Sequence, residues 1–438
     1  MAKFAINKSA KIRIRQAARS AVEDFLEARP RSEKSRKWIL QKNRYRRSCT
    51  GQYEEDIESK PSQVKDAQLL AYVGASAPCH AIDGWSFLGR AVDSALRGDT
   101  YSATHFGYYA ELRAAMSLLG AEGIGVFNGV HAVIDNAGIV HRFPPIRGKQ
   151  VTHQVIWPVL KFWTSLERAK DVIDFVVAPN DIRLSDWLGV AGGQHNMRAL
   201  AAKWLSFWGL DLAALDSDHD RRNLVSYRPS EFRKARADVR ATTQFVEELW
   251  NLFEPSQDVR FPLIGNFLLR RAWRQLSCGK PQQQRLMDLG LNEAEAQDWL
   301  VFLDSKAEDP LPIALATQVS SIENSLCHLQ VIARATLLLF VASASARKLL
   351  ADASYTEDDL AFWWKQYGAD RGLWPMSTSP GDKFEPWADI AQQCQASSRW
   401  RADRELASSS FYDWRLENPQ LPTNLGAMEL LGIWSLLP

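Results

Sequence analysis

The segment between Asp99 and Gly123 constrains the fold more than any other part of this 438-residue sequence. Aspartate and threonine are common helix N-cap residues and glycine is common just past a helix end, so Asp99 or Thr100 and the pair Gly120 and Gly123 predict one helix between them. Small residues, which let a neighbouring helix approach closely, alternate here with leucines that fill a core: Ala110, Leu112, Ala114, Ala115, Leu118 and Leu119. Such a helix predicts a packed bundle.

Most of the remaining sequence also has the helical period, and we expect a mainly α fold. Predicted helices cover residues 8–28, 152–177, 231–253 and 320–350, among others. One stretch has the strand period instead, because alternating apolar residues flank the turn sequence Asn136-Ala137-Gly138. Residues 131–143 therefore predict a small β-hairpin within the helical fold.

Composition is that of a soluble globular protein, with 46% apolar and 24% charged residues. The longest apolar candidate, residues 333–350, is interrupted by charged and hydroxyl side chains, so we expect no membrane span.

The N-terminus lacks the apolar region of a signal peptide, and five scattered cysteines fit a reducing compartment, which together predict a cytoplasmic protein. No clustered metal ligands and no phosphate-binding or dinucleotide-binding glycine motif are present, so we expect neither metal nor cofactor.

Charge is concentrated at the N-terminus. Residues 1–47 hold fifteen Lys or Arg against four acids, a net charge of +11, which leaves −9 for the remainder of a chain whose net charge is +2. Dense cations neutralise phosphates, so this arm predicts nucleic-acid binding. A solvated face, or a clamp onto an acidic partner subunit, explains the same charges. The candidate contacts are Lys11, Arg13, Arg15, Arg36, Lys37, Arg44, Arg46 and Arg47.

Three regions are expected from the helix breaks and the shift in charge. Residues 1–60 form a basic helix and arm, and residues 61–255 form a helical domain that contains the hairpin. Pro255 follows a strong helix and marks the second boundary, beyond which residues 256–438 form a second helical domain. The seventeen tryptophans are expected to fill cores and interfaces, with stacking platforms for bases as the alternative.

Two segments carry a possible chemistry. The first is the doubled tyrosine Tyr108-Tyr109 inside the Ala- and Leu-rich helix, and the second is Arg222-Asn223, with Tyr227 four residues after Asn223. Together they resemble the HEPN superfamily of helical bundles over roughly residues 60–255. Many members of that superfamily cut RNA with an Arg-Asn-x-x-x-His motif, in which the Arg holds the phosphate and the His transfers a proton. Tyr227 occupies the position of that His.

The resemblance implies a site that contains Arg222, Asn223 and Tyr227. Because tyrosine has an ordinary pKa of about 10, Tyr227 is a poor base near neutral pH. His105, one helical turn before Tyr108-Tyr109, is a candidate to replace the missing imidazole. Further candidates are His131, His141, His153 and His195. In the alternative interpretation these residues are structural: Arg222 pairs with Asp218 or Glu231, and Tyr227 packs its ring.

Three functions remain open. The first is a HEPN-like nucleic-acid-associated binding or scaffold subunit of a prokaryotic complex, such as an antiviral defence system. The resemblance implies a homodimer or a hetero-complex. The second is a metal-independent RNase that uses Arg222, Asn223 and either Tyr227 or a nearby His. The third is an accessory subunit that docks onto an ATPase or nuclease partner through residues 256–438.

Overall fold

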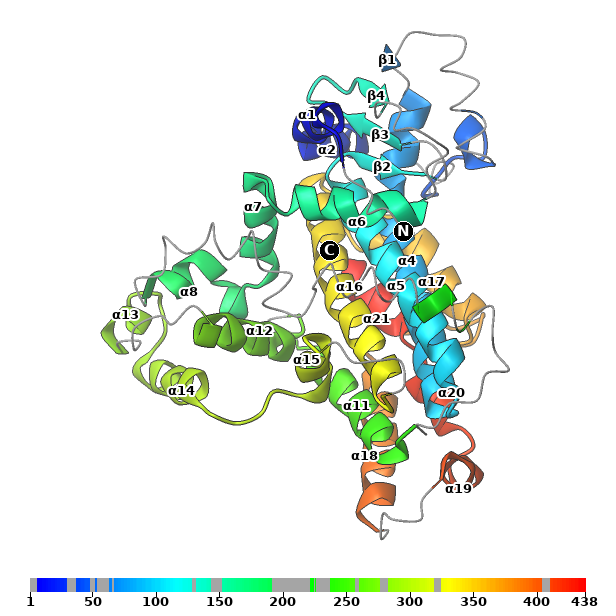
Figure 1. The fold of residues 1–438 in the computed structure, drawn as a ribbon, viewed down its shortest axis with the longest axis vertical. Helices are drawn as coiled ribbons and strands as arrows, with labels where there is room; N and C mark the ends of the chain where they lie inside the picture. Colours follow the sequence, from blue (N-terminus) through cyan, green and yellow to red (C-terminus); the bar gives the residue numbers. More distant parts are fainter. Residues whose placement is uncertain are drawn as a thin grey trace.

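The protein is mainly helical in the computed structural model, as expected, and carries one small sheet (Figure 1). The structure describes residues 6–29, 37–47, 52, 63–64, 67–127, 131–142, 152–190, 221–223, 225, 237–256, 260–275, 283–318, 324–403 and 410–438.

Long helices form the centre of the molecule (Figure 1). The helices α4 (Ala67–Leu96) and α5 (Thr100–Ala121) are joined by three residues and pack along their lengths as an antiparallel pair. A third long helix, α16 (Cys327–Asp352), lies along α5 and also contacts α4 and the short helix α21 (Glu429–Leu436). The predicted helix from residue 100 to 120 is therefore confirmed, and the Asp99 side chain caps it by accepting from the Ser102 backbone N–H at 3.0 Å.

Glycines let these helices approach closely. A Cβ atom built on Gly120 of α5 would lie 2.6 Å from the Ser76 hydroxyl of α4, and one built on Gly107 would lie 3.0 Å from a methyl carbon of Val331 on α16. The first distance is shorter than a non-bonded contact allows, so the α4–α5 interface requires glycine at residue 120.

A buried ion pair joins α5 to α16. The Arg334 Nε lies 3.6 Å from Glu111 Oε1, and both side chains are 0% exposed. Arg334 also donates from Nη1 to the Gln318 carbonyl at 3.1 Å. Because both charges are removed from water, loss of either one takes this attraction away from the other while that other charge stays buried.

The N-terminal helices and the sheet cover one end of this bundle (Figure 1). The sheet has the order β1-β4-β3-β2, formed by β1 (Gln63–Val64), β2 (Ile124–Val126), β3 (His131–Ile134) and β4 (Val140–Arg142). The antiparallel pair β3–β4 confirms the predicted hairpin. Its turn is held by the Asp135 carboxylate, which accepts from the Ala137 and Ile139 N–H groups, and Gly138 adopts a left-handed φ of 71°.

The helix predicted over residues 8–28 is two helices, α1 (Lys8–Gln16) and α2 (Arg19–Glu27). The break at Ala17–Ala18 allows the Ala18 N–H to bond the Ile134 carbonyl of β3 at 2.9 Å. This long-range hydrogen bond fixes the start of α2 on the sheet, and helical periodicity alone does not reveal it.

A buried carboxylate fastens these N-terminal helices to the bundle. Glu122, 1% exposed at the end of α5, lies 3.3 Å from Arg19 and 3.9 Å from Arg168. Arg168 also donates to the carbonyls of Ile14 and Ala17. Burial raises the pKa of Glu122 above its ordinary value. Part of the positive charge of the N-terminal segment is therefore used inside the fold.

Shorter helices complete the chain. The helix predicted over residues 152–177, which we expected Pro158 to bend or to split, is two helices, α6 (Thr152–Trp163) and α7 (Glu167–Val176). The break lies at residues 164–166, and Pro158 is inside α6. A lobe beside the bundle contains α8 (Leu184–Val190), α12 (Pro262–Gln275), α13 (Gln283–Met287) and α14 (Glu293–Asp304) (Figure 1). The remaining described helices are η2 (Arg44–Arg46), η3 (Pro179–Asp181), α11 (Val239–Leu252), α15 (Leu311–Ala316), η5 (Asp358–Leu360), α17 (Ala361–Asp370), α18 (Trp387–Ala402), α19 (Phe411–Glu417) and α20 (Leu421–Leu425).

One core crosses the boundary predicted at Pro255. The helices α16 and α21 lie after it, α4 and α5 lie before it, and all four contribute to the same buried cluster. Residues 61–255 and 256–438 thus share a core within the described part of the chain. Several of the tryptophans are also fully buried in it, as expected of core residues: Trp85, Trp163, Trp187, Trp250, Trp414 and Trp434.

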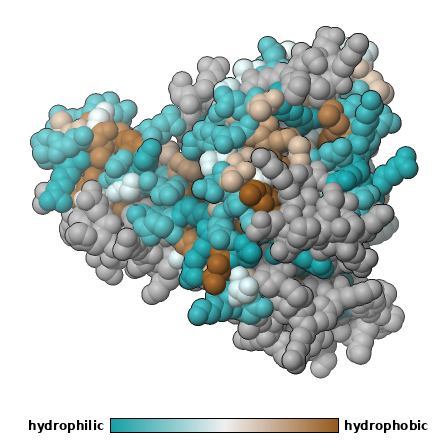
Figure 2. All heavy atoms as spheres, turned by 90° about the horizontal axis from the view of Figure 1, so that it is seen from above, coloured by the Kyte–Doolittle hydropathy of each residue, from teal (hydrophilic) through white to brown (hydrophobic). Residues whose placement is uncertain are grey.

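The helix α16 is long and apolar enough to cross a membrane by length and composition. Every residue of its most apolar stretch is buried inside the protein, so packing against the rest of the bundle accounts for its hydrophobicity. Over the described residues, Figure 2 shows a surface that is mainly hydrophilic, on which hydrophobic atoms form small, separate patches.

We predict that Arg334→Met lowers the free energy of unfolding by about 3–5 kcal/mol, because it removes the positive charge of Arg334 from beside the buried Glu111 carboxylate. Urea denaturation measures this change. The double variant with Glu111→Gln should recover a large part of the loss. Lys348→Met, which removes an exposed pair with Asp352 on the same helix, is the matched control and should cost less than ~1 kcal/mol. Equal losses in both single variants would contradict a special role for the buried pair.

Candidate functional site

The doubled tyrosine lies in the middle of α5, on the side that faces α6. Tyr108 is fully buried, whereas Tyr109 and His105, one turn earlier, are half-buried. His153 lies in the first turn of α6, and its Nδ1 is 2.8 Å from the Tyr108 hydroxyl. The two rings also stack, with centroids 5.6 Å apart. The helix α5 thus supplies two tyrosines and one histidine, and α6 supplies a second histidine.

Arg222 packs against both tyrosines. Its guanidinium carbon lies 5.4 Å from the centre of the Tyr108 ring and 5.6 Å from that of Tyr109. Both distances are within the range of cation–π attraction. The two predicted segments, separated by more than a hundred residues, therefore meet in space. We name the group of Arg222, His105, Tyr108, Tyr109 and His153 the arginine–tyrosine cluster.

The surroundings of Arg222 are mostly protein. Its side chain is only 8% exposed, and its Nε has no hydrogen-bond partner among the described residues. Nor does any carboxylate in the described part of the chain form an ion pair with it. The pairing with Asp218 or Glu231 considered from the sequence falls on residues outside the described ranges. The guanidinium keeps one donor unused, but this Nε is itself shielded from solvent, so an anion reaches it only if neighbouring side chains move.

Burial changes the acid–base properties of the cluster. It raises the pKa of Tyr108 above the ordinary tyrosine value, so the phenol stays protonated near neutral pH. It also lowers the pKa of His105, and the positive charge of Arg222 lowers that pKa further. His105 is therefore neutral at pH 7, the form in which an imidazole accepts a proton.

The other residues of the predicted motif are less informative. Asn223 is half-buried next to Arg222. Tyr227, which takes the place of the superfamily's histidine, lies outside the described residues. From the sequence, His153 was only one of several histidines that could replace the missing imidazole, and no partner was predicted for it. It lies 45 residues after Tyr108 on a different helix, and no spacing in the sequence indicates that they meet.

The basic residues of α1 divide into two groups. Arg13 is half-buried, and its Nη1 lies 3.3 Å from His141 Nδ1 on the hairpin. Lys11 and Arg15 are exposed, and each lies over the Phe162 ring of α6, at 5.6 and 5.2 Å. The α1 helix is thus folded onto the body of the protein, and two of its predicted nucleic-acid contacts face solvent.

The second basic stretch covers residues 37–47 and lies beside the N-terminal end of α4. Lys37, Arg44, Arg46 and Arg47 are all exposed, and η2 (Arg44–Arg46) contains two of them. Arg44 stacks on the Tyr45 ring at 5.0 Å, while the Arg44 backbone N–H donates to the Gln68 side chain at 3.0 Å. Arg36 lies outside the described residues.

Metal chemistry has no support from side-chain geometry. In the ranges that the structure describes, no three His, Cys, Asp or Glu side chains are grouped closely enough to hold an ion. What the arginine–tyrosine cluster offers is a guanidinium for binding an anion and two imidazoles for proton transfer.

Comparisons with known proteins add no identification. A scan against protein-family models, a search of curated proteins and a search of solved structures each found no match.

We predict that Arg222→Gln raises the pKa of His105, because it removes one of the two causes that lower it. The value should stay below that of an exposed histidine, since burial continues to disfavour the charged ring. A pH titration of the histidine ring signals by NMR measures both values. Arg240→Gln, an exposed arginine on α11, should leave the titration unchanged. An unchanged His105 pKa in Arg222→Gln would contradict the contact.

Proposed function

We propose that this protein is a HEPN-like, nucleic-acid-associated binding subunit, and that single-stranded RNA or DNA binds across its basic end. The observation that carries the proposal is the group of exposed cations on α1 and on residues 37–47, which lie on the same end of the molecule as the sheet (Figure 1). We name Lys11, Arg15, Arg46 and Arg47 the basic face.

The charges of the basic face are available to a ligand. Within the described residues, no ion pair joins any of the four side chains to a carboxylate. By contrast, Arg19 and Arg168 nearby are committed to the buried Glu122. The exposed acids of α2, Asp24 and Glu27, reduce the local positive potential but form no ion pair with the basic face. Unpaired exposed cations release counterions from phosphates, which drives binding without sequence preference.

We predict that replacing the four cations of the basic face by glutamine weakens binding of single-stranded RNA at least about tenfold and lowers its salt dependence. Each lost phosphate contact should reduce the slope of log K against log salt by ~0.7. Fluorescence anisotropy at several salt concentrations measures both effects. A control variant removes the same charge elsewhere from exposed positions: Arg240→Gln, Lys306→Gln, Lys365→Gln and Arg399→Gln. If RNA binding weakens equally in the two variants, the net charge of the protein alone explains the effect. That result would contradict binding at the basic face.

A second candidate function, metal-independent cleavage of RNA, is favoured by the arginine–tyrosine cluster. Arg222 would hold the phosphate, and neutral His105 would accept the proton of the ribose 2′-hydroxyl. The 2′-oxygen would then attack the adjacent phosphorus, and the bond to the 5′-oxygen would break. The second imidazole, His153, would act in its protonated form and give its proton to that oxygen, so that His105 gains one proton and His153 loses one. The products would be a 2′,3′-cyclic phosphate and a 5′-hydroxyl.

We predict that such cleavage proceeds in EDTA, acts on RNA but not on DNA of the same sequence, and falls at least about a hundredfold in His105→Ala or Arg222→Ala. Gel analysis of labelled oligonucleotides measures the rates. The exposed Arg240→Ala is the matched control and should cleave at the normal rate. Absence of RNA cleavage by the unmodified protein would eliminate the catalytic function and leave the binding function standing.

A further inference from the structure

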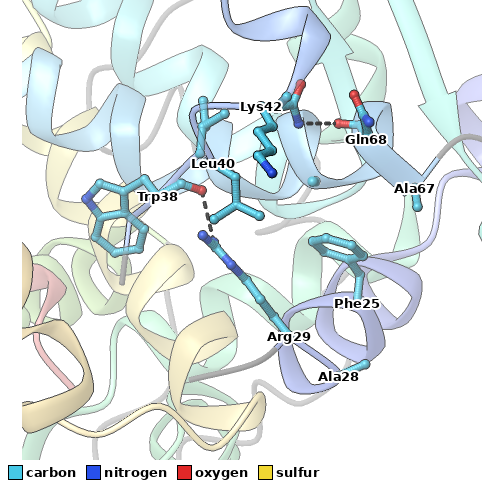
Figure 3. A pocket seen from close by; sticks show the side chains of 11 residues that line it. Phe25, Ala28, Arg29, Trp38, Leu40, Lys42, Ala67 and Gln68 are labelled. Atoms are coloured by element: carbon cyan, nitrogen blue, oxygen red, sulfur yellow. Dashed lines mark hydrogen bonds between the residues drawn. The ribbon is translucent and has the colours of Figure 1, made fainter. Parts of the chain in front are cut away.

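A cavity of about 300 Å³ lies between the end of α2, residues 38–43 and the beginning of α4 (Figure 3). It is separate from the arginine–tyrosine cluster, and the proposed function makes no use of it. Its walls are almost entirely apolar, being formed by Phe25, Trp38, Ile39, Leu40, Ala67 and Ala71. Cavities of this size with apolar walls and few polar groups are typical of small-molecule sites.

Long-range contacts hold the walls in place. The Arg29 Nη1 donates to the Trp38 carbonyl at 2.9 Å, which links the end of α2 to the opposite wall. The Asn43 side chain donates to the Gln68 carbonyl on α4 at 2.8 Å. The Trp38 ring packs against Trp363 of α17 with centroids 5.5 Å apart. Three contacts to three different helices therefore fix the segment that closes the cavity.

The charged groups that line the cavity among the described residues are cationic. Arg29 and Lys42 line it together with the uncharged Asn43 and Gln68, and none of the described lining residues is acidic. Figure 3 shows the Lys42 amino group turned toward the space between Leu40, Phe25 and Arg29. Among the described residues, Lys42 forms no ion pair with a carboxylate. From this charge and shape we infer that the cavity binds a small amphipathic anion, with its apolar part against Phe25 and Leu40 and its carboxylate at Lys42.

The size of the cavity indicates the size of the ligand. A space of about 300 Å³ corresponds to roughly ten water-sized groups, since liquid water occupies about 30 Å³ per molecule. A medium-chain carboxylate such as decanoate has this size. A nucleobase fits the cavity less well, because the walls offer few hydrogen-bond partners for its polar edge. The Gln68 carbonyl already accepts a hydrogen bond from the Asn43 side chain, and the Gln68 side chain accepts one from the Arg44 backbone N–H.

Isothermal titration of the full-length protein with decanoate, below its micelle concentration, tests this inference. We expect saturable binding at one site, and binding of decanol that is about tenfold weaker because it lacks the charge. Lys42→Gln should weaken decanoate binding about tenfold and leave decanol binding unchanged. Lys306→Gln, an exposed lysine near α14, is the matched control and should change neither.

A second variant tests the apolar wall. Leu40 is 45% exposed, so Leu40→Asp is not expected to disturb folding, and it should abolish decanoate binding by repulsion and by loss of the apolar contact. Circular dichroism verifies the fold. Absence of binding to the unmodified protein, or equal affinity for decanoate and decanol, would overturn the inference. Displacement of decanoate by single-stranded RNA that requires Lys42 would assign the cavity to nucleic acid and overturn it as well.

Discussion

The buried ion pair between Glu111 and Arg334 is the contact on which the central bundle depends. It lies between α5 and α16, where neither charge reaches solvent. A buried pair contributes little net stability compared with apolar residues of the same shape, but loss of one partner is costly. The pair therefore selects one register of α16 against α5. That register joins segments from the two halves of the chain in a single core.

The arginine–tyrosine cluster is positioned by the same helix. Glu111 follows Tyr108 by three residues, about one turn, so the register that buries the carboxylate also sets the direction of the tyrosine pair. The helix α6 then brings His153 to the Tyr108 hydroxyl, and Arg222 covers the two rings. Burial has a chemical consequence here, because it lowers the pKa of His105 and so keeps this imidazole neutral beside the charged guanidinium.

Local patterns predicted much of the fold, and long-range contacts account for what they missed. The helix from residue 100 to 120 and the β3–β4 hairpin follow from capping, period and turn residues. The break before α2 depends on a hydrogen bond from Ala18 to Ile134, and the shared core depends on α16 crossing to α5. For the site, Arg222 and His105 were selected from the sequence and lie in one cluster. His153 could not be distinguished from the other candidate histidines, since nothing in its spacing indicates contact with Tyr108.

Cross-linking of a bound oligonucleotide tests the central claim of nucleic-acid association most directly. After irradiation of the complex with single-stranded RNA and digestion, mass spectrometry identifies the peptides that carry nucleotide adducts. If nucleic acid binds at the basic face, we expect the adducts to be concentrated on peptides that cover residues 8–16 and 37–47. Adducts confined to the lobe that contains α13 and α14, or no adducts at concentrations that saturate binding, would contradict it.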